Sequence, residues 1–196
     1  VYYDIYKLLF VKDVVMSENA SWIFSVTPYI YFASAAAAVV LIPVILQFGV
    51  ISVWGDAILA VYLLALGRFF LALAGLDTGS SFGGMGSSRE MMVSSIFEPA
   101  LMVNLLTLGL VTGSTHFASM MQGRTGNFVS ILEPTYVLTF LSVFIILLAE
   151  TARIPVDDPA THLELTMIHE AMVLEYSGRH LGLIVWGAAV KQLLFI

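Results

Sequence analysis

Long apolar runs alternate with short polar segments along the chain. No charged residue occurs between Glu18 and Asp56, and further apolar runs follow to the end of the sequence. A helix rises about 1.5 Å per residue, so about 20 mostly apolar residues cross a hydrocarbon core about 30 Å thick. The pattern predicts an all-α fold, a polytopic transmembrane helix bundle with spans near 27–48, 54–76, 91–112, 134–152 and 181–196.

Basic residues mark one side of this bundle. Five of the eight Lys and Arg residues lie in the segments 1–26, 77–90 and 151–180, which successive spans place on the same side. Of the Lys and Arg residues, the loops on the other side, 49–53 and 113–133, contain only Arg124. Because cytoplasmic loops carry an excess of Lys and Arg, we expect the first three segments to face the cytoplasm. The five residues are Lys7, Lys12, Arg89, Arg153 and Arg179.

The three segments on that side differ in composition. Residues 2–13 combine tyrosines with leucines and are predicted to form an interfacial helix, because tyrosine rings suit the headgroup region. Residues 77–90 are rich in Gly and Ser, which favours an irregular loop. Pro155 and Pro159 end the fourth span. Residues 157–178 are then predicted to form an acidic cytoplasmic loop and helix, too polar to cross the membrane.

Composition agrees with a membrane protein. Hydrophobic residues make up 59% of the chain and charged residues 11%, with a mean hydropathy of +0.94, whereas soluble domains carry about 25% charged residues. A net charge of −6 speaks against nucleic-acid binding. Without cysteine, the chain holds neither a thiolate-ligated iron–sulfur cluster nor a disulfide. Because it starts at Val1 and stops inside an apolar run, we expect residues 1–196 to be a single membrane domain from a longer protein.

Among the charged residues within the predicted spans, four are considered as candidate site residues: Arg68, Glu98, Glu150 and Lys191. Each such charge costs at least about 2.5 kcal/mol at membrane depth. Arg68 either extends to the headgroups or pairs with an acid inside the bundle. Glu98 is either an interior proton-exchanging group or a structural hydrogen-bonding group. Glu150 lies at the end of its span, where it is either interior or solvated, and Lys191 lies deep enough to need a partner acid or a water-filled cavity.

The densest charge signal is the stretch 150–175. It holds six of the fourteen acids and one basic residue, Arg153. On a helix over 161–176, Glu164 and Glu175 share one face, which is either a solvated surface or a group of coupled carboxylates that handle protons. Arg153 is predicted to be their buried counter-ion, because a proline turns the chain just after it. The six acids are Glu150, Asp157, Asp158, Glu164, Glu170 and Glu175.

Two histidines, His162 and His169, lie seven residues apart on the opposite face of that helix. Metal-binding pairs on a helix usually stand four residues apart. Hydrogen bonding or proton transfer by the histidines is therefore favoured over a metal site. The glycines at 79–86 follow an apolar helix and not a strand, so they do not indicate a phosphate-binding loop.

Two motifs resemble those of a known family. Residues 150–157 (ETARIPVD) resemble the E-x-x-R-x-P-x-D signature after the fifth span of the H subunit of respiratory NADH:quinone oxidoreductase (complex I). Residues 175–178 match its E-Y-S-G motif. Residues 67–101 and 155–178 resemble the matching membrane-anchor subunit of group 4 membrane-bound NiFe hydrogenases, including formate hydrogenlyase. The resemblance runs along essentially the whole chain.

The resemblance implies a piece of an eight-span, non-catalytic subunit in the cell inner membrane, with its motif-bearing loops in the cytoplasm. Such a subunit binds no cofactor or metal itself. It anchors iron–sulfur and hydrogenase-like peripheral subunits, which carry the iron–sulfur clusters and the NiFe centre, and couples them to antiporter-like subunits within the lipid membrane. Arg89 and Asp77 are expected to face the peripheral arm. The residues expected to serve ion translocation and coupling are Glu98, Glu150, Arg153, Asp157, Glu164, Glu170, Glu175 and Lys191.

Two alternatives stay open. The first is the quinone-site subunit of a complex I-type NADH:quinone oxidoreductase. His169 and Glu170 stand where other residues are usual in complex I proper, and this difference bears on any quinone site. The second is a stand-alone secondary transporter, which also places charges near the membrane midplane. Transporters of that kind usually contain internal repeats, and the sequence shows none.

Overall fold

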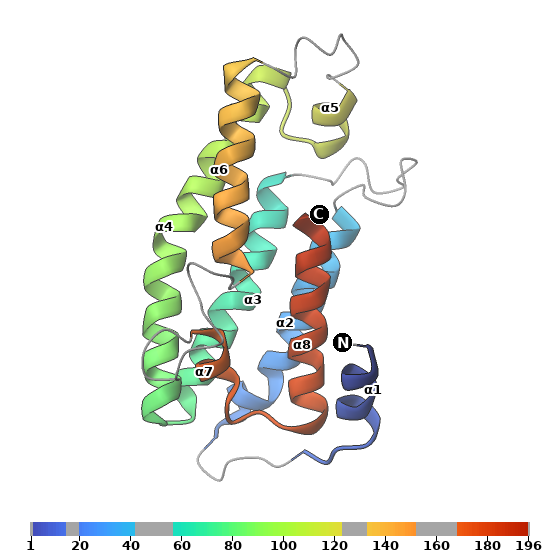
Figure 1. Cartoon of the computed structure of the whole chain (residues 1–196), viewed down its shortest axis with the longest axis vertical. Coiled ribbons are helices and arrows are strands. Elements are labelled where there is room, and N and C mark those ends of the chain that lie inside the picture. Colours follow the sequence, from blue (N-terminus) through green and yellow to red (C-terminus); the bar gives the residue numbers. More distant parts are fainter. Residues whose placement is uncertain (1, 15–19, 42–56, 123–132, 152–167, 196) are drawn as a thin grey trace.

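The computed structural model describes residues 2–14, 20–41, 57–122, 133–151 and 168–195. These residues form helices and no strand, which confirms the all-α prediction for the described part of the chain (Figure 1). In chain order the helices are α1 (Tyr2–Phe10), α2 (Trp22–Leu41), α3 (Ala57–Asp77), α4 (Ser81–Thr112), α5 (Phe117–Gln122), α6 (Pro134–Glu150), α7 (His169–Val173) and α8 (Gly178–Phe195).

The long helices pack as one bundle. Helix α2 contacts α3 and α8, α3 contacts α4, and α4 contacts α6 and α7, while α1 packs on α8. In Figure 1, α1, α7 and the first turns of α4 and α8 lie toward the same end of the bundle, as the alternation of basic segments predicted. Of the described helices, α2, α3 and α4 are long and apolar enough to cross a membrane, and α6 is a shorter apolar helix.

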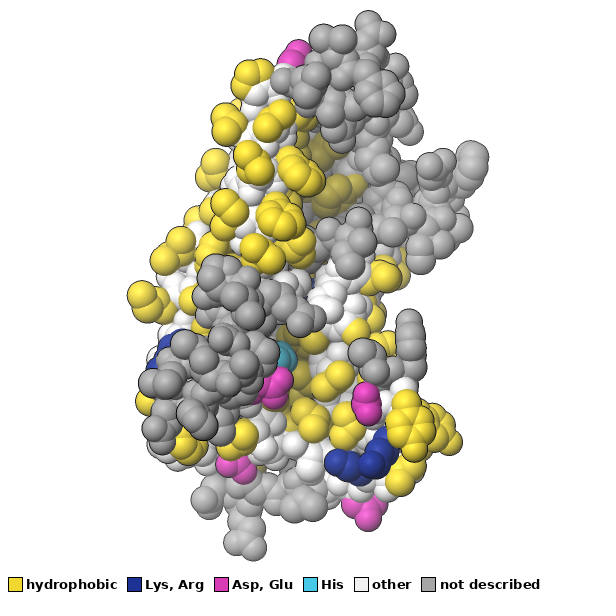
Figure 2. Space-filling view, in the orientation of Figure 1, with side chains coloured by type: hydrophobic (Ala, Val, Ile, Leu, Met, Phe, Trp, Pro, Cys, Tyr) yellow, Lys and Arg dark blue, Asp and Glu magenta, His cyan; other side chains and the backbone are white. Residues whose placement is uncertain are grey.

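The outer surface of the bundle is strongly apolar. Figure 2 shows hydrophobic side chains gathered along α4 and α6. On these helices Leu110 is 86% exposed and Phe140 is 70% exposed. Contiguous exposed apolar surface of this kind marks contact with lipid or with another protein. The two helices are also joined by a polar contact, because the Asn104 side-chain amide donates to the Ser142 hydroxyl over 2.8 Å.

The start of α4 corrects one prediction. Residues 77–90 are not an irregular loop, because α4 is helical from Ser81 onward. The Ser80 hydroxyl accepts a hydrogen bond from the Gly83 amide over 3.1 Å and thereby caps the helix. With 32 residues, α4 is about 48 Å long, so it extends well beyond a hydrocarbon core of about 30 Å.

The glycines of this segment allow close packing between helices. A Cβ atom at Gly86 would lie 2.9 Å from the Ala171 Cβ atom on α7, and one at Gly83 would collide with the carbonyl oxygen of Gly75 on α3. Glycine lowers helix stability by about 1 kcal/mol relative to alanine. At this site the contacts with α3 and α7 outweigh that penalty, and composition alone therefore suggested the wrong structure.

The first predicted span also begins earlier than expected, at Trp22. The Ser21 hydroxyl accepts from the Ile23 amide over 3.3 Å, and the Ser21 amide donates to Asp77 Oδ2 over 2.7 Å. These bonds satisfy amide groups that a helix start leaves free. Asp77 thus holds the beginning of α2, and its contact with a peripheral arm stays a prediction. The predicted span residues 42–48, 54–56, 152 and 196 lie outside the described part.

Tyr176, the tyrosine of the E-Y-S-G motif, replaces a hydrogen bond that Pro28 removes from α2. Pro28 lies inside α2 and has no amide hydrogen, so the carbonyl oxygen of Phe24, four residues earlier, loses its helical donor. The Tyr176 hydroxyl donates to that oxygen over 3.0 Å, and the two rings stack with centroids 4.0 Å apart. Burial raises the pKa of the Tyr176 phenol, so the hydroxyl remains a donor.

Replacing Tyr176 by phenylalanine should destabilise the protein by about 1–3 kcal/mol, because the stacking is kept while a buried carbonyl oxygen loses its donor. Thermal unfolding of the purified protein in detergent measures the effect. Tyr3→Phe is the control, because Tyr3 is 77% exposed and should tolerate the change. Equal melting temperatures for the two variants would contradict this role of Tyr176.

Candidate functional site

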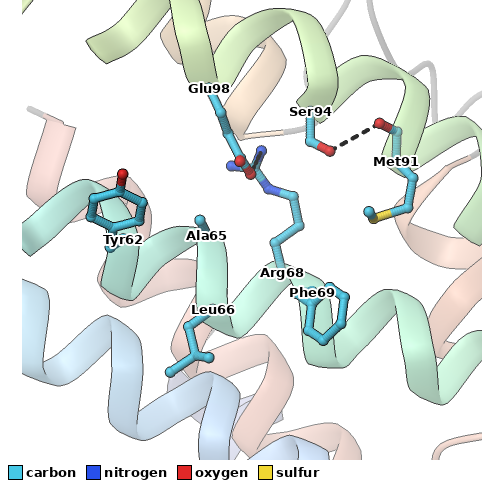
Figure 3. Close-up of a pocket in the computed structure, with 8 residues that line it drawn as sticks. All are labelled: Tyr62, Ala65, Leu66, Arg68, Phe69, Met91, Ser94 and Glu98. Atoms are coloured by element: carbon cyan, nitrogen blue, oxygen red, sulfur yellow. Dashed lines mark hydrogen bonds and ion pairs between the residues drawn. The ribbon is translucent and has the colours of Figure 1, made fainter.

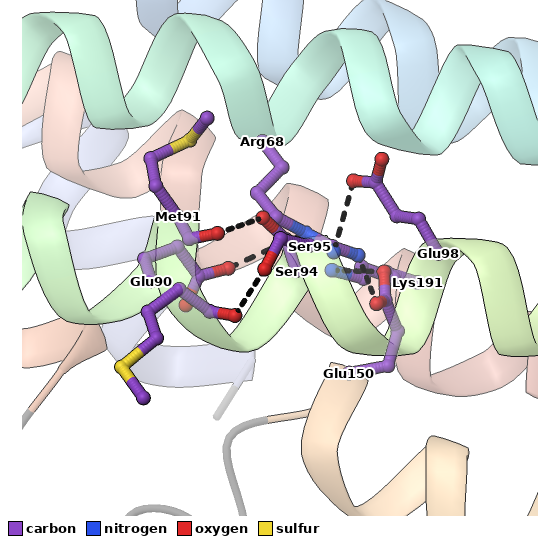
Figure 4. A network of polar contacts seen from close by, with 9 residues as sticks. Arg68, Glu90, Met91, Ser94, Ser95, Glu98, Glu150 and Lys191 are labelled. Atoms are coloured by element: carbon purple, nitrogen blue, oxygen red, sulfur yellow. Dashed lines mark hydrogen bonds and ion pairs between the residues drawn. The ribbon is translucent and has the colours of Figure 1, made fainter.

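One arginine joins three carboxylates inside the bundle (Figure 4). Arg68 extends from α3, and its side chain is only 7% exposed. Its Nη1 atom donates to Glu98 Oε1 over 3.1 Å, and Nη2 donates to Glu150 Oε2. Its Nε atom lies 3.3 Å from Glu90 Oε1, without the alignment of a hydrogen bond. Each guanidinium nitrogen thus faces a different acid, and the structure decides for pairing over extension to the headgroups.

A lysine completes the set from a fourth helix. Lys191 Nζ on α8 lies 2.7 Å from Glu150 Oε1. The Glu150 side chain is 4% exposed and that of Lys191 is 9% exposed, so Glu150 is interior and Lys191 has the partner acid that its depth required. We call Arg68, Glu90, Glu98, Glu150 and Lys191 the ionic cluster.

The ionic cluster connects four helices that lie far apart in the sequence, namely α3, α4, α6 and α8. If every group is ionised, its three carboxylates and two cations leave one net negative charge. Charges at a few ångströms in a medium of low dielectric constant interact strongly. A proton gained or lost by one carboxylate therefore changes the electrostatic balance of the others.

The Tyr31 ring extends from α2 into the space between α3 and α8. A Cβ atom at Gly187 on α8 would lie 2.8 Å from the Tyr31 ring, and one at Gly67 on α3 would lie 3.4 Å from it. The two glycines therefore form a slot that admits the ring. The buried phenol in turn lies within electrostatic reach of Lys191 and Glu150.

A cavity of about 340 Å³ opens between α3 and α4 beside the cluster (Figure 3). Arg68 and Glu98 provide its charged groups, and the Glu98 side chain is 37% exposed. Its other lining residues are Tyr62, Ala65, Leu66, Phe69, Met91 and Ser94. Glu98 is thus reached from the flank of the bundle, whereas Glu150 is enclosed.

The structure brings together only part of the predicted set. Glu98, Glu150 and Lys191 meet in the ionic cluster. Glu170 on α7 and Glu175 after it are exposed, and Arg89 is half-buried on α4. The predictions for Arg153, Asp157, Asp158, His162 and Glu164 fall outside the described residues. Among the described residues, no three His, Asp or Glu side chains are arranged to hold a metal ion.

Sequence reasoning left Arg68 undecided and missed Glu90. Glu90 lies eight residues before Glu98, so about 12 Å separates the two along a helix. An arginine side chain between them can reach both. The spacing would have revealed this arrangement if the helix had been extended through residues 77–90, but the glycines and serines there pointed to a loop.

The model of the NADH dehydrogenase family matches residues 1–196. The chain belongs to this family. The resemblance indicated by the two motifs is therefore confirmed, and the chain is a membrane protein.

Two curated relatives of this NADH dehydrogenase family chain come from Escherichia coli (strain K12). Hydrogenase-4 component C is 37% identical over 191 residues, with 97% of this chain and 59% of that protein covered. Formate hydrogenlyase subunit 4 is 33% identical over 195 residues, with 100% of this chain and 62% of that protein covered. The chain thus spans about six-tenths of the length of these relatives.

More distant similarity extends to complex I. The H subunit of NADH-quinone oxidoreductase from Rubrobacter xylanophilus is 29% identical over 185 residues, with 92% of this chain and 54% of that protein covered. Among solved structures, a chain of the membrane-bound sulfane sulfur reductase, an archaeal respiratory membrane complex, matches with a TM-score of 0.81, covering 99% of this chain and 62% of that chain. At 18% identity, that likeness concerns the fold alone.

Proposed function

We propose that this chain is part of the membrane-anchor and ion-translocation coupling subunit of a membrane-bound NiFe hydrogenase complex. The observation that carries the proposal is the ionic cluster, in which acids and bases from four helices meet inside an apolar bundle. Such groups are expensive at membrane depth and mark ion or proton pathways. The two hydrogenase relatives, at 37% and 33% identity, support this branch over the complex I branch, at 29%.

In this proposal the end of the bundle that holds α1, α7 and the first turns of α4 faces the cytoplasm and a peripheral redox arm. Arg89 and Asp77 lie toward that end. The ionic cluster lies deeper and responds to the redox reaction by changing its protonation or its pairing. Antiporter-like subunits then receive that change. No redox group is assigned to this chain.

Purification of the full-length protein from its native membrane tests the assignment. We expect iron–sulfur proteins, antiporter-like proteins and a nickel-containing subunit to copurify. A complex with NADH-oxidising activity and no nickel would support the quinone-reductase alternative, and recovery of the protein alone or as a homo-oligomer would support the transporter alternative.

Replacing Glu98 by glutamine should weaken ion pumping while the complex stays assembled, because glutamine keeps the shape of the side chain and loses the titrating proton. Generation of a membrane potential in sealed vesicles, measured per hydrogenase turnover, tests this prediction. Glu133→Gln is the control, since Glu133 is an exposed residue at the start of α6. Unchanged coupling at normal turnover in the Glu98 variant would refute it.

A further inference from the structure

The three carboxylates around Arg68 are not equivalent. Glu150 accepts a hydrogen bond from Arg68, faces Lys191 as well, and is 4% exposed. Glu98 accepts from Nη1 and borders the cavity on the flank of the bundle. Glu90 lies 3.3 Å from Nε, but the buried Nε–H group is not aimed at an acceptor. Glu90 is thus the carboxylate that Arg68 holds least firmly.

Glu90 also has a distinct position along the bundle. It is the tenth residue of α4 and lies about 12 Å nearer the helix start than Glu98. That end of α4 packs against α7 and is rich in Gly and Ser. The Glu90 side chain is 20% exposed, compared with 4% for Glu150. Glu90 therefore lies between the aqueous end of the bundle and its interior.

We propose that Glu90 is the group through which the ionic cluster exchanges protons with the aqueous phase at the α7 end. A proton from water binds the Glu90 carboxylate and makes it neutral, and the positive charge of Arg68 is then balanced by Glu98 and Glu150 alone. When Glu90 releases the proton to water, its negative charge returns to the Nε side of Arg68. This inference deepens the proposed coupling function and rests on it.

Several charged or titratable groups surround this exchange. On α4 itself they are Arg89 and Glu98, on α3 they are Arg68 and Asp77, and on α6 the group is Glu150. Helix α7 adds His169 and Glu170, Lys191 on α8 contacts Glu150, and the buried Tyr31 phenol on α2 lies within electrostatic reach of Glu90, Glu150 and Lys191. Arg68 is in direct contact with Glu90. Because Arg68 also contacts Glu98 and Glu150, a change of Arg68 would disturb the whole cluster, and substitution of Glu90 tests the exchange most directly.

The experiment uses the whole complex in sealed vesicles whose α7 end faces outward. Glu90→Gln should lower the rate of membrane-potential generation at least tenfold, while hydrogenase turnover with an uncoupler present is unchanged. Added acetate should restore part of the rate, because a small acid can carry protons in place of the missing carboxyl group. The potential is the suitable measurement, since permeation of neutral acetic acid does not change it. Glu98→Gln, with its side chain on the flank, should gain nothing from acetate.

A normal pumping rate in Glu90→Gln, or a loss that acetate leaves unchanged, would overturn the proposal, because a purely structural defect is not repaired by a small acid. Infrared difference spectra between acid and alkaline buffers provide a second test that does not depend on pumping. The carbonyl band of a protonated carboxyl group should be absent in Glu90→Gln and shifted in Glu90→Asp. If the wild-type complex pumps no ions but shows this band, the coupling function fails and the proton exchange stands. If the band persists in Glu90→Gln, the exchange fails.

Discussion

Replacement of Arg68 by methionine is expected to remove most of the assembled protein from the membrane. Methionine keeps much of the side-chain volume but leaves Glu90, Glu98 and Glu150 with Lys191 as their remaining cation in the cluster. Breaking a buried ion pair by removing one partner costs about 3–5 kcal/mol, a large share of the about 5–15 kcal/mol by which proteins are stable. The amount of protein in isolated membranes and its melting temperature in detergent measure the effect.

The Arg68→Lys variant separates the effect of the positive charge from the effect of the side-chain geometry. Arg68→Lys restores the positive charge but supplies one nitrogen, whereas each of the three arginine nitrogens lies near a different acid. We expect partial recovery of the protein level and poor coupling. Arg179→Met is the control, because Arg179 is exposed in the first turn of α8. A normal level of Arg68→Met protein, equal to that of Arg179→Met, would show that the cluster is not needed for stability.

Replacement of Gly178 by alanine should have a similarly large effect for a different reason. Gly178, the last residue of the E-Y-S-G motif, has a φ angle of +51°, which costs about 1–2 kcal/mol for other residues. A Cβ atom there would also lie 2.5 Å from the backbone carbonyl oxygen of Asp13. The chain after α1 would have to move away from the start of α8, so strain and lost packing add together.

Substitutions of two other glycines separate the cost of backbone strain from the cost of the close contact with Asp13. Gly79 has a φ angle of +65° and open space around it, so Gly79→Ala should cost only the strain, about 1–2 kcal/mol. Gly84 lies within α4 with open space, so Gly84→Ala should be neutral or slightly stabilising. Melting temperatures should fall in the order Gly84→Ala, Gly79→Ala, Gly178→Ala. Equal values for the last two would show that contact with Asp13 contributes nothing.

The structure gives roles to residues of both motifs identified from the sequence, but it describes only the E-Y-S-G motif in full. In E-Y-S-G, Tyr176 satisfies the carbonyl oxygen freed by Pro28, and Gly178 permits contact with the chain after α1. Both roles concern packing of the bundle. In the E-x-x-R-x-P-x-D motif, Glu150 has Arg68 and Lys191 as partners, whereas the residues after Thr151 lie outside the described part. The predicted pairing of Arg153 with Glu150 therefore stays a prediction.

The sequence by itself determined the all-α class and the family. These depend on apolar length and on short motifs, which are local properties of the chain. Local patterns also located Glu98, Glu150 and Lys191, because a charge within an apolar run is conspicuous. They misjudged residues 77–90, where glycine indicates a loop unless a neighbouring helix packs against it.

Only the tertiary structure decided which charges meet. Arg68 contacts Glu90 and Glu98 on the next long helix and Glu150 on α6, and Lys191 reaches Glu150 from α8. These pairings depend on the rotation and relative height of four packed helices. Neither quantity follows from the apolar pattern of any one helix, because a helix buries or exposes a given face only in relation to its neighbours.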